Sequence, residues 1–366
     1  MTDETLEVPA ARAGPDEAVD AAATANDAPR EENWLALARR STAFWIGLAI
    51  VVLGVGFGVF SGGAFTRDSN LLSIGLNSSQ IMLLAVGMTF LIGAGQLDLS
   101  VGFNLIMSSV LAAKVMVALG GTVEQVAARD YPNLIPAVIA GIAVAILVGA
   151  AGGLLNGLLV TRLRINSFIV TLATSGMFYG VVLILTSAAN VPFLPQEIQT
   201  YFGAARDPIL DRVPLPLIVA LLIAAVFWWV MRRTRFGLHT LAIGSSREAA
   251  IRAGIDVDRH LVKLFVLMGV LVGIAGLYDL VRYASTNVVG HQTDNLQAIS
   301  AVVIGGTSLF GGVASIGGSL LGTLIPVMMG NGLIILRVQP FYQLIVVGII
   351  LVIAVYLDQR RRGGMA

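Results

Sequence analysis

The stretch LIPAVIAGIAVAILVGAAGGLLNGLLVT, residues 134–161, decides the fold class of this chain. It contains no charged side chain. A bilayer core of about 30 Å is crossed by a helix of roughly 20 apolar residues. The stretch is longer than this minimum, so it predicts a helix that spans a membrane.

The composition extends this prediction to the whole chain. Of 366 residues, 56% are hydrophobic and only 12% are charged, and the mean hydropathy is +0.85. A soluble domain carries about 25% charged residues, so the excess apolar surface requires lipid as its solvent. The net charge of +1 gives no indication of a nucleic-acid partner. The absence of cysteine excludes disulfides, thiol catalysis and cysteine-ligated metals, and His239, His260 and His291 lie too far apart in sequence to suggest a ligand cluster.

Applied along the chain, the same criterion predicts an all-α membrane protein with about ten transmembrane helices. We expect them at 42–60, 71–94, 99–119, 134–161, 166–186, 214–231, 262–283, 296–310, 313–335 and 341–357. The weakest is Leu296–Phe310, which is short and glycine-rich at its end, so a half-span or re-entrant element is the alternative there. Residues 1–40 are rich in Ala, Asp, Glu and Pro and predict a disordered tail.

The basic residues predict an orientation. If the N-terminus is cytoplasmic, sixteen Lys and Arg residues fall on inside segments and six on outside segments. This asymmetry follows the positive-inside rule. We therefore expect both termini in the cytoplasm, with a basic tail at 359–366 and the transmembrane domain at 41–358.

A short sequence echo suggests two inverted repeats, helices 2–5 and 7–10 of the predicted set. Asn156-Gly157-Leu158 closes the fourth predicted helix, and Asn331-Gly332-Leu333 closes the ninth. In the predicted orientation these two helices end on opposite sides, as inverted transporter repeats would. Chance similarity between apolar helices is the alternative, and the sequence leaves both open.

The longest basic segment on the inside, residues 232–262, predicts a short rigid helix outside the membrane. Ser245 and Glu248 have the spacing of a capping box, Glu248 and Arg252 form a favourable i,i+4 pair, and Gly254 is placed to end the helix. The helix would present a small, smooth face to a cytoplasmic partner. The alternative is a solvated connector whose charges only keep the loop inside. The residues we assign to this candidate contact surface are Ser245, Arg247, Glu248, Ala249, Ala250, Arg252 and Gly254.

Polar residues within the predicted spans are candidates for a substrate path. Asp98 is a charged residue beside an apolar span and therefore a functional candidate, although it can also be the N-cap of a helix that begins at Leu99. An uncharged polar solute would need hydrogen-bonding groups and an apolar or aromatic wall. The candidates are Asn77, Gln80, Asp98, Asn104, Asn156, Phe178 and Tyr179. Hydrogen bonding between helices is the alternative role for each of them.

Four segments carry a resemblance to a known family. Glu248-Ala249-Ala250 followed by Gly254 resembles the coupling motif of binding-protein-dependent ABC permeases, although the Leu-Pro often found downstream is absent. Residues 95–102, GQLDLSVG, are similar to a segment of ribose-type sugar permeases, with Gln96 and Leu97 as departures. The stretches 166–172 and 298–312 resemble two further segments of that family in the same order.

This resemblance implies a permease that pairs with a second copy or a similar subunit. It would receive a monosaccharide or polyol from an extracytoplasmic binding protein and move it when cytoplasmic ATPase subunits hydrolyse ATP. The chain itself has no Walker A motif, because neither Lys114 nor Lys263 follows a glycine. We therefore expect no cofactor in this chain and ATP-Mg only in the partner ATPase.

Three other classes stay open at this level. The first is an ABC permease for branched-chain amino acids or nucleosides. The second is an ion-coupled secondary transporter, which generally needs intramembrane carboxylates that are scarce here. The third is a passive channel, which would not need the structured cytoplasmic loop predicted at 232–262. The sequence does not name the sugar.

Overall fold

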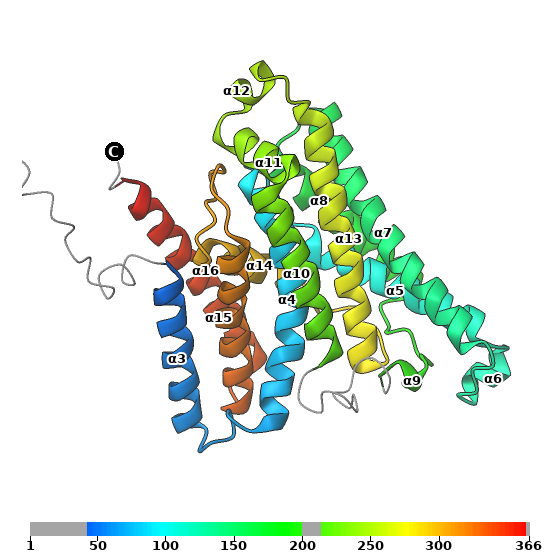
Figure 1. Cartoon of the computed structure of the whole chain (residues 1–366). Coiled ribbons are helices and arrows are strands. Elements are labelled where there is room, and N and C mark those ends of the chain that lie inside the picture. The colour runs from blue at the N-terminus through cyan, green and yellow to red at the C-terminus, as the bar shows by residue number, and fades with distance from the viewer. Residues whose placement is uncertain (1–41, 200–213, 364–366) are drawn as a thin grey trace, which may run out of the picture.

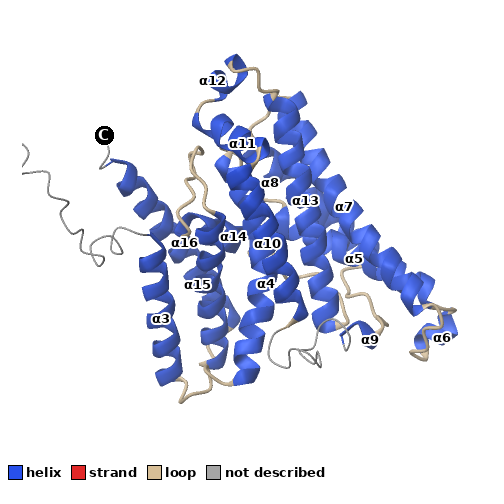
Figure 2. Cartoon of the chain, viewed as in Figure 1, coloured by secondary structure: helices blue, strands red, loops and turns tan. Residues whose placement is uncertain are grey.

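A computed structural model describes residues 42–199 and 214–363, which form helices and loops and contain no strand (Figure 2). The predicted tail at 1–40 lies outside the described residues. The helices are α3 (Thr42–Phe60), α4 (Asp68–Gly93), α5 (Val101–Gly120), α6 (Val123–Ala127), α7 (Leu134–Arg162), α8 (Ser167–Thr186), α9 (Gln196–Ile198), α10 (Leu215–Arg233), α11 (Arg235–Ser245), α12 (Arg247–Arg252), α13 (Val257–Tyr283), α14 (Asp294–Ile304), α15 (Ile316–Ile335) and α16 (Pro340–Gly363). This is the predicted all-α membrane class.

Each predicted span corresponds to a helix, but one helix is too short to span. Among the described residues, eight helices are long and apolar enough to cross a membrane: α3, α4, α5, α7, α8, α10, α13 and α15. The predicted span at 341–357 falls within α16. In contrast, α14 has 11 residues, so the prediction of a full span at 296–310 is wrong and the shorter alternative holds. The helix ends at Gly305 and Gly306, and Gly306 has a φ of +88°, a left-handed conformation that glycine adopts readily.

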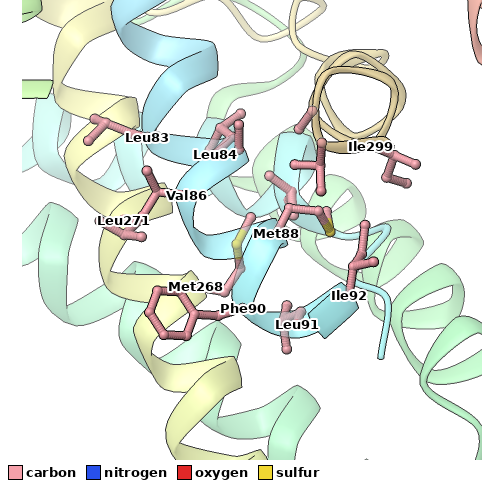
Figure 3. Close-up of a cluster of buried hydrophobic side chains, with 14 of the residues drawn as sticks. Leu83, Leu84, Val86, Met88, Phe90, Leu91, Ile92, Met268, Leu271 and Ile299 are labelled. Carbon is pink, nitrogen blue, oxygen red and sulfur yellow. The ribbon is translucent and has the colours of Figure 1, made fainter. Parts of the chain in front are cut away.

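Helix α4 forms the centre of the bundle (Figure 1). From Ser78 to Gly93 every residue is buried, and α4 packs against α10, α13, α14 and α15. Figure 3 shows part of this core: Met268 and Leu271 of α13 lie beside Val86 and Phe90, and Ile299 of α14 lies on another side of α4. Met268 occupies the space above Gly87, where a Cβ would lie 2.3 Å from its sulfur. From Ile81 to Gly93 the helix is apolar on every side apart from Thr89, and such a segment is expected in a central position.

Helices α7 and α13 pack so closely that only small residues fit between them. Ala145, Gly149, Gly153 and Gly157 recur every four residues on α7 and so share one face. A Cβ on Gly153 would lie 2.1 Å from the Phe265 carbonyl oxygen of α13. Small residues at this spacing let backbones approach in membrane proteins, where van der Waals packing replaces the hydrophobic effect. The decisive stretch of the sequence therefore encodes a helix contact as well as a span.

The packing of α4, α5, α7 and α8 has a counterpart in α13, α14, α15 and α16. Helix α5 contacts α7 and α8, and α14 contacts α15 and α16. Across the two groups, α4 packs on α15 while α13 packs on α7, and α4 also contacts α13 directly. This matching set of contacts supports the duplication predicted for helices 2–5 and 7–10. The principal difference is that α14 is shorter than α5.

Candidate functional site

The linker between α4 and α5, residues 94–100, is not helical and is held by side chains from other helices. The Leu97 amide donates to Ser167 Oγ at 3.2 Å, and the Leu99 amide donates to Thr171 Oγ1 at 3.0 Å. Both hydroxyls belong to the first turns of α8. Asn295, in the first turn of α14, donates from Nδ2 to the Leu99 carbonyl at 3.1 Å. Non-helical backbone in a membrane domain requires such partners, because lipid offers none.

Asp98 lies inside this arrangement and does not cap the helix at Leu99, so that prediction is wrong. Helix α5 begins at Val101 with Ser100 as its N-cap residue. Asp98 Oδ1 accepts from the Ser100 amide at 2.9 Å and from Ser100 Oγ at 2.6 Å. Its side chain is 2% exposed. Burial raises the pKa of Asp98, and the Ser100 hydrogen bonds oppose this rise.

Asn156 joins the linker to α7 and α8. Its Nδ2 donates to Ser100 Oγ at 2.8 Å, and its Oδ1 accepts from Thr174 Oγ1 at 2.7 Å. Asn156 is fully buried, so both ends of its amide are satisfied by protein. We call residues 94–100 with Asn156, Ser167, Thr171 and Thr174 the linker network.

The predicted cytoplasmic loop contains two helices, α11 and α12, which project from one end of the bundle (Figure 1). Ser245 is not the cap of α12 as predicted, because it still belongs to α11. The cap is Ser246, whose Oγ accepts from the Ala249 amide at 3.3 Å. Gly254 has a φ of +82° and follows the end of α12, as predicted.

Helix α12 is exposed on one face and fastened on the other. Glu248 and Arg252 form the predicted i,i+4 pair at 3.9 Å, and both side chains are exposed. Arg247 Nη2 pairs with Asp258 Oδ1 of α13 at 2.8 Å, and Ala250 is buried against the bundle. Exposed ion pairs contribute little stability, so burial of Ala250 is the firmer attachment.

Three glycines bring the loop into backbone contact with the bundle. A Cβ on Gly244 of α11 would lie 1.9 Å from the Gly93 carbonyl oxygen at the end of α4, and 2.5 Å from the Gly312 amide nitrogen. The Gly312 amide in turn donates to the Gly93 carbonyl at 3.0 Å. We call this contact the glycine junction. It connects the loop that carries α12 to the residue next to the linker network.

A cavity of about 1010 Å³ lies on the same side of the molecule, between the linker and α12. Gln96 and Leu97 line it from the linker, Asn166 and Phe168 from the start of α8, and Ile251 from α12. The space therefore separates the exposed helix from the linker network, and the glycine junction lies where the loop that carries α12 meets the end of α4.

A second, polar cavity of about 480 Å³ lies near the opposite end of α13 from α12. Asn77 and Gln80 line it from α4, Arg282 from the end of α13, and Asn331 from α15. The loop before α14 and the start of that helix contribute His291, Asp294 and Gln297. We call this space the polar cavity. Its polar side chains come from four helices, α4, α13, α14 and α15, and from the loop before α14.

Charged groups in the wall of the polar cavity are paired. His291 Nδ1 lies 2.8 Å from Asp294 Oδ2, and His291 Nε2 lies 3.2 Å from Asp279 Oδ1 of α13. Burial alone would lower the pKa of His291, but the two carboxylates outweigh it and raise that pKa to about 10. His291 is therefore charged at neutral pH, between two acidic partners.

Arg282 stands at the rim of the polar cavity. Its guanidinium donates to Asn77 Oδ1 and lies 4.8 Å from the centre of the Tyr283 ring. Its backbone carbonyl accepts from Gln199 Nε2 at 2.7 Å. A guanidinium fixed over an aromatic ring keeps further N–H donors directed into the space beside it.

The structure separates the residues that were predicted for one path. Asn77 and Gln80 lie together in the polar cavity, whereas Asp98 and Asn156 belong to the linker network. Asn104 donates to the Gly149 carbonyl between α5 and α7 at 3.1 Å. Phe178 is buried, and Tyr179 packs on Phe103 at 5.1 Å between ring centres. Neither of the two cavities is lined by Asn104, Phe178 or Tyr179.

Several residues of the polar cavity were missed by sequence reasoning. The residues predicted for the substrate path did not include Arg282, nor did they include His291 and Asp294. Both of the latter side chains point inward and are nearly buried. Asp279 is a carboxylate inside an apolar span, a signal that could have found it. The pairing of His291 with two aspartates depends on the fold and leaves no local pattern.

Comparisons with known proteins give matches over most of the chain. A family model described as the branched-chain amino acid transport system / permease component matches residues 70–355. The chain is 34% identical to the D-allose transport system permease protein of Escherichia coli (strain K12), over 85% of this chain and 89% of that protein. It is 36% identical to the ribose import permease protein of Bacillus subtilis (strain 168), over 81% and 87% respectively. It is 35% identical to the L-arabinose ABC transporter permease protein of Azospirillum brasilense, over 81% and 82%. No solved structure gives a significant match.

Proposed function

We propose that this chain, which belongs to the family described as the branched-chain amino acid transport system permease component, is the membrane-spanning permease subunit of an ATP-driven importer of a neutral sugar. The observation that carries the proposal is that the relatives similar over most of its length are permeases for D-allose, ribose and L-arabinose. The resemblance of the four sequence segments to ribose-type permeases agrees with these matches.

The division of labour in such a system fits the features of this chain. The permease is a transport subunit and not an enzyme, and its sequence has no Walker A motif. We infer that ATP-Mg is bound by separate cytoplasmic ATPase subunits, that an extracytoplasmic binding protein delivers the sugar, and that a second copy of this chain completes the membrane domain. The apolar outer faces of α3 and α7 would contact lipid.

The proposed orientation places α12 in the cytoplasm and the polar cavity toward the outside. It follows from the positive-inside distribution and from the position of the two features at opposite ends of α13. Both termini would then be cytoplasmic. In this orientation the polar cavity receives the sugar, and α12 contacts the ATPase.

We infer that movement of α12 reaches the linker network through the glycine junction. The candidate contact residues are Ser245, Arg247, Glu248, Ala249, Ala250, Arg252 and Gly254, to which the structure adds Ser246 as the cap. Gly244 has no room for a side chain against Gly93, so displacement of α11 must displace the end of α4. The linker that follows would then shift against Ser167 and Thr171.

Uptake into liposomes tests the proposal. The permease would be reconstituted with its partner ATPase and binding protein, and uptake of radiolabelled ribose, allose and arabinose would be compared with that of leucine. We expect ATP-dependent uptake of at least one sugar and none of leucine. Leucine uptake would favour the amino-acid alternative, and sugar uptake without any ATPase would overturn the proposal.

Glu248→Gln tests the role of α12 in the same assay. It keeps the helix but removes the acidic group that α12 presents to its partner. We expect reduced sugar uptake per ATP hydrolysed with normal membrane insertion. Gly176→Ala is the matched control, because a Cβ there meets no atom within 4 Å.

A further inference from the structure

The polar cavity has the composition of a binding site for an uncharged polyhydroxylated ligand. Its wall combines amide groups of Asn77, Gln80, Gln297 and Asn331, each of which can donate and accept hydrogen bonds. Its volume of about 480 Å³ falls within the range of roughly 300–1,000 Å³ of small-molecule sites. Sugar hydroxyls likewise donate and accept, so amides are suitable partners for them.

The charges of the described residues in and beside the cavity cancel. Arg282 and protonated His291 contribute two positive charges, and Asp279 and Asp294 contribute two negative charges. His291 lies between the two carboxylates, so they neutralise its positive charge within the cavity wall. A ligand with a net charge would find no unbalanced counter-charge and would have to lose its hydration without compensation.

Arg282 is the group best placed to orient the ligand. Its guanidinium has five N–H donors, of which the Asn77 contact uses only part. The flat fork can reach two neighbouring oxygen atoms at once, which matches a pair of vicinal hydroxyls. The Tyr283 ring below it restricts its motion.

We propose that the polar cavity is a sugar-binding site of the permease itself, selective for neutral sugars over charged ones, with Arg282 as its main specificity-determining residue. This inference rests on the proposed function and adds a recognition step after delivery by the binding protein. The cavity combines amide groups with aliphatic side chains, and Tyr283 contributes its phenol ring. With so little aromatic surface to stack on a sugar, its affinity is weak and selection works through charge and hydrogen bonding.

Ligand binding to the purified permease–ATPase complex without the binding protein tests the site. Saturation-transfer NMR would compare D-ribose, D-allose and L-arabinose with gluconate, an acid, and glucosamine, a cation at neutral pH. We expect signals from at least one neutral sugar and much weaker signals from both charged ones. Equal signals from all five probes, or none from any neutral sugar, would overturn the inference.

Charge variants then test whether the balance of positive and negative charges around the polar cavity determines its selectivity for neutral sugars. Arg282→Gln leaves one net negative charge, so the neutral sugar should bind roughly tenfold more weakly while the glucosamine signal rises. Asp294→Asn leaves one net positive charge and should raise the gluconate signal. Unchanged selectivity in both variants would contradict the proposal.

Two further variants separate recognition from folding. Arg232→Gln is the matched control, because Arg232 also lies over an aromatic ring, Trp228 at 5.2 Å, but at the end of α10 away from the cavity. It should leave binding unchanged. Asn331→Leu keeps a similar volume, removes one amide from the wall and should weaken sugar binding. It provides the test of recognition in case Arg282→Gln does not fold.

Transport measurements distinguish failure of this inference from failure of the proposed function. If the complex imports a sugar but Arg282→Gln, Asp294→Asn and Asn331→Leu all leave the KM for the delivered sugar and its selectivity unchanged, the permease has no such site and the function stands. If no sugar is imported by the complete system, the function itself fails.

Discussion

The two ends of helix α4 present polar groups to the rest of the molecule in opposite ways. After its C-terminal end, the linker network satisfies Asp98, the Leu97 and Leu99 amides and both ends of the Asn156 amide with protein partners. Along its N-terminal half, Asn77 and Gln80 face the open polar cavity. Closed networks stabilise one conformation, whereas groups with unused hydrogen-bonding capacity beside open space are suited to a ligand.

The same contrast runs between the two groups of helices. The segment before α5 is bound closely by α7 and α8, whereas the segment before α14 borders a cavity. Each precedes the corresponding helix in its group, and the two meet where Asn295 donates to the Leu99 carbonyl. The segment before α5 thus belongs to a closed network, whereas the segment before α14 belongs to the candidate recognition site.

The largest effect should come from Gly244→Ala, which separates the linker network from the loop that we propose to move it. The added methyl group would lie 1.9 Å from the Gly93 carbonyl, so the glycine junction must open. We expect sugar uptake per ATP to fall by about tenfold or more, within the roughly 5–150-fold range of typical coupling. Proteoliposome uptake and ATPase rates measured together would show this.

Gly176→Ala serves as the control for this variant, and gel filtration reports on assembly. Full uptake per ATP in Gly244→Ala would show that the glycine junction carries no movement.

Asn156→Leu should disrupt the linker network, in which the polar groups are satisfied by protein partners. It removes two buried hydrogen bonds and leaves Ser100 and Thr174 each short of a partner, so we expect the free energy of unfolding to fall by about 3 kcal/mol. Equilibrium unfolding in mixed detergent and SDS micelles would measure it. Asn77→Leu at the open end should cost less than half as much, and an equal loss in both variants would remove the contrast.

His291, beside the polar cavity, should make the stability of the folded protein depend on pH. Its pKa is about 10 in the folded protein and about 6.5 when unfolded, so its ion pairs stabilise the fold fully below the lower value. Between the two values the folded state holds one proton more than the unfolded state, and stability falls as pH rises. Thermal unfolding from pH 7 to 10 should show this decline, and His291→Gln should flatten it. Parallel curves for the two proteins would contradict the assignment.

The smallest effect should come from Asp98→Asn. The amide oxygen can still accept from Ser100, and the change removes a carboxylate whose ionised form burial disfavours, so we expect a stability change within about 1 kcal/mol. Uptake should be retained. Loss of uptake with normal stability would show that Asp98 acts in the substrate path, the alternative that its sequence position first suggested.

The helices could be predicted from sequence because lipid imposes a local requirement on each of them. Nearly every span was found within a few residues, since a run such as 134–161 must be apolar wherever it packs. The short α14 was harder, because its apolar residues continue past its end and only the left-handed Gly306 stops it. The exposed end of α12 was likewise readable from Glu248, Arg252 and Gly254, although its cap was placed one residue too early.

The candidate site was less accessible because it is assembled from distant segments. Asn77 and Gln80 could be selected as polar residues in a span, but nothing local joins Asn77 to Arg282 or His291 to Asp279. The fold separates the residues predicted for the path into the linker network, the polar cavity and helix contacts.

By itself, the sequence determined that the chain is a helical membrane protein, which family it resembles and where the exposed helix α12 lies, because each of these follows from composition or from short contiguous patterns. Only the tertiary structure decided which polar residues are closed off and which face open space. Hydrogen-bond satisfaction and charge balance depend on side chains that come together from different helices, and no spacing along the chain specifies them.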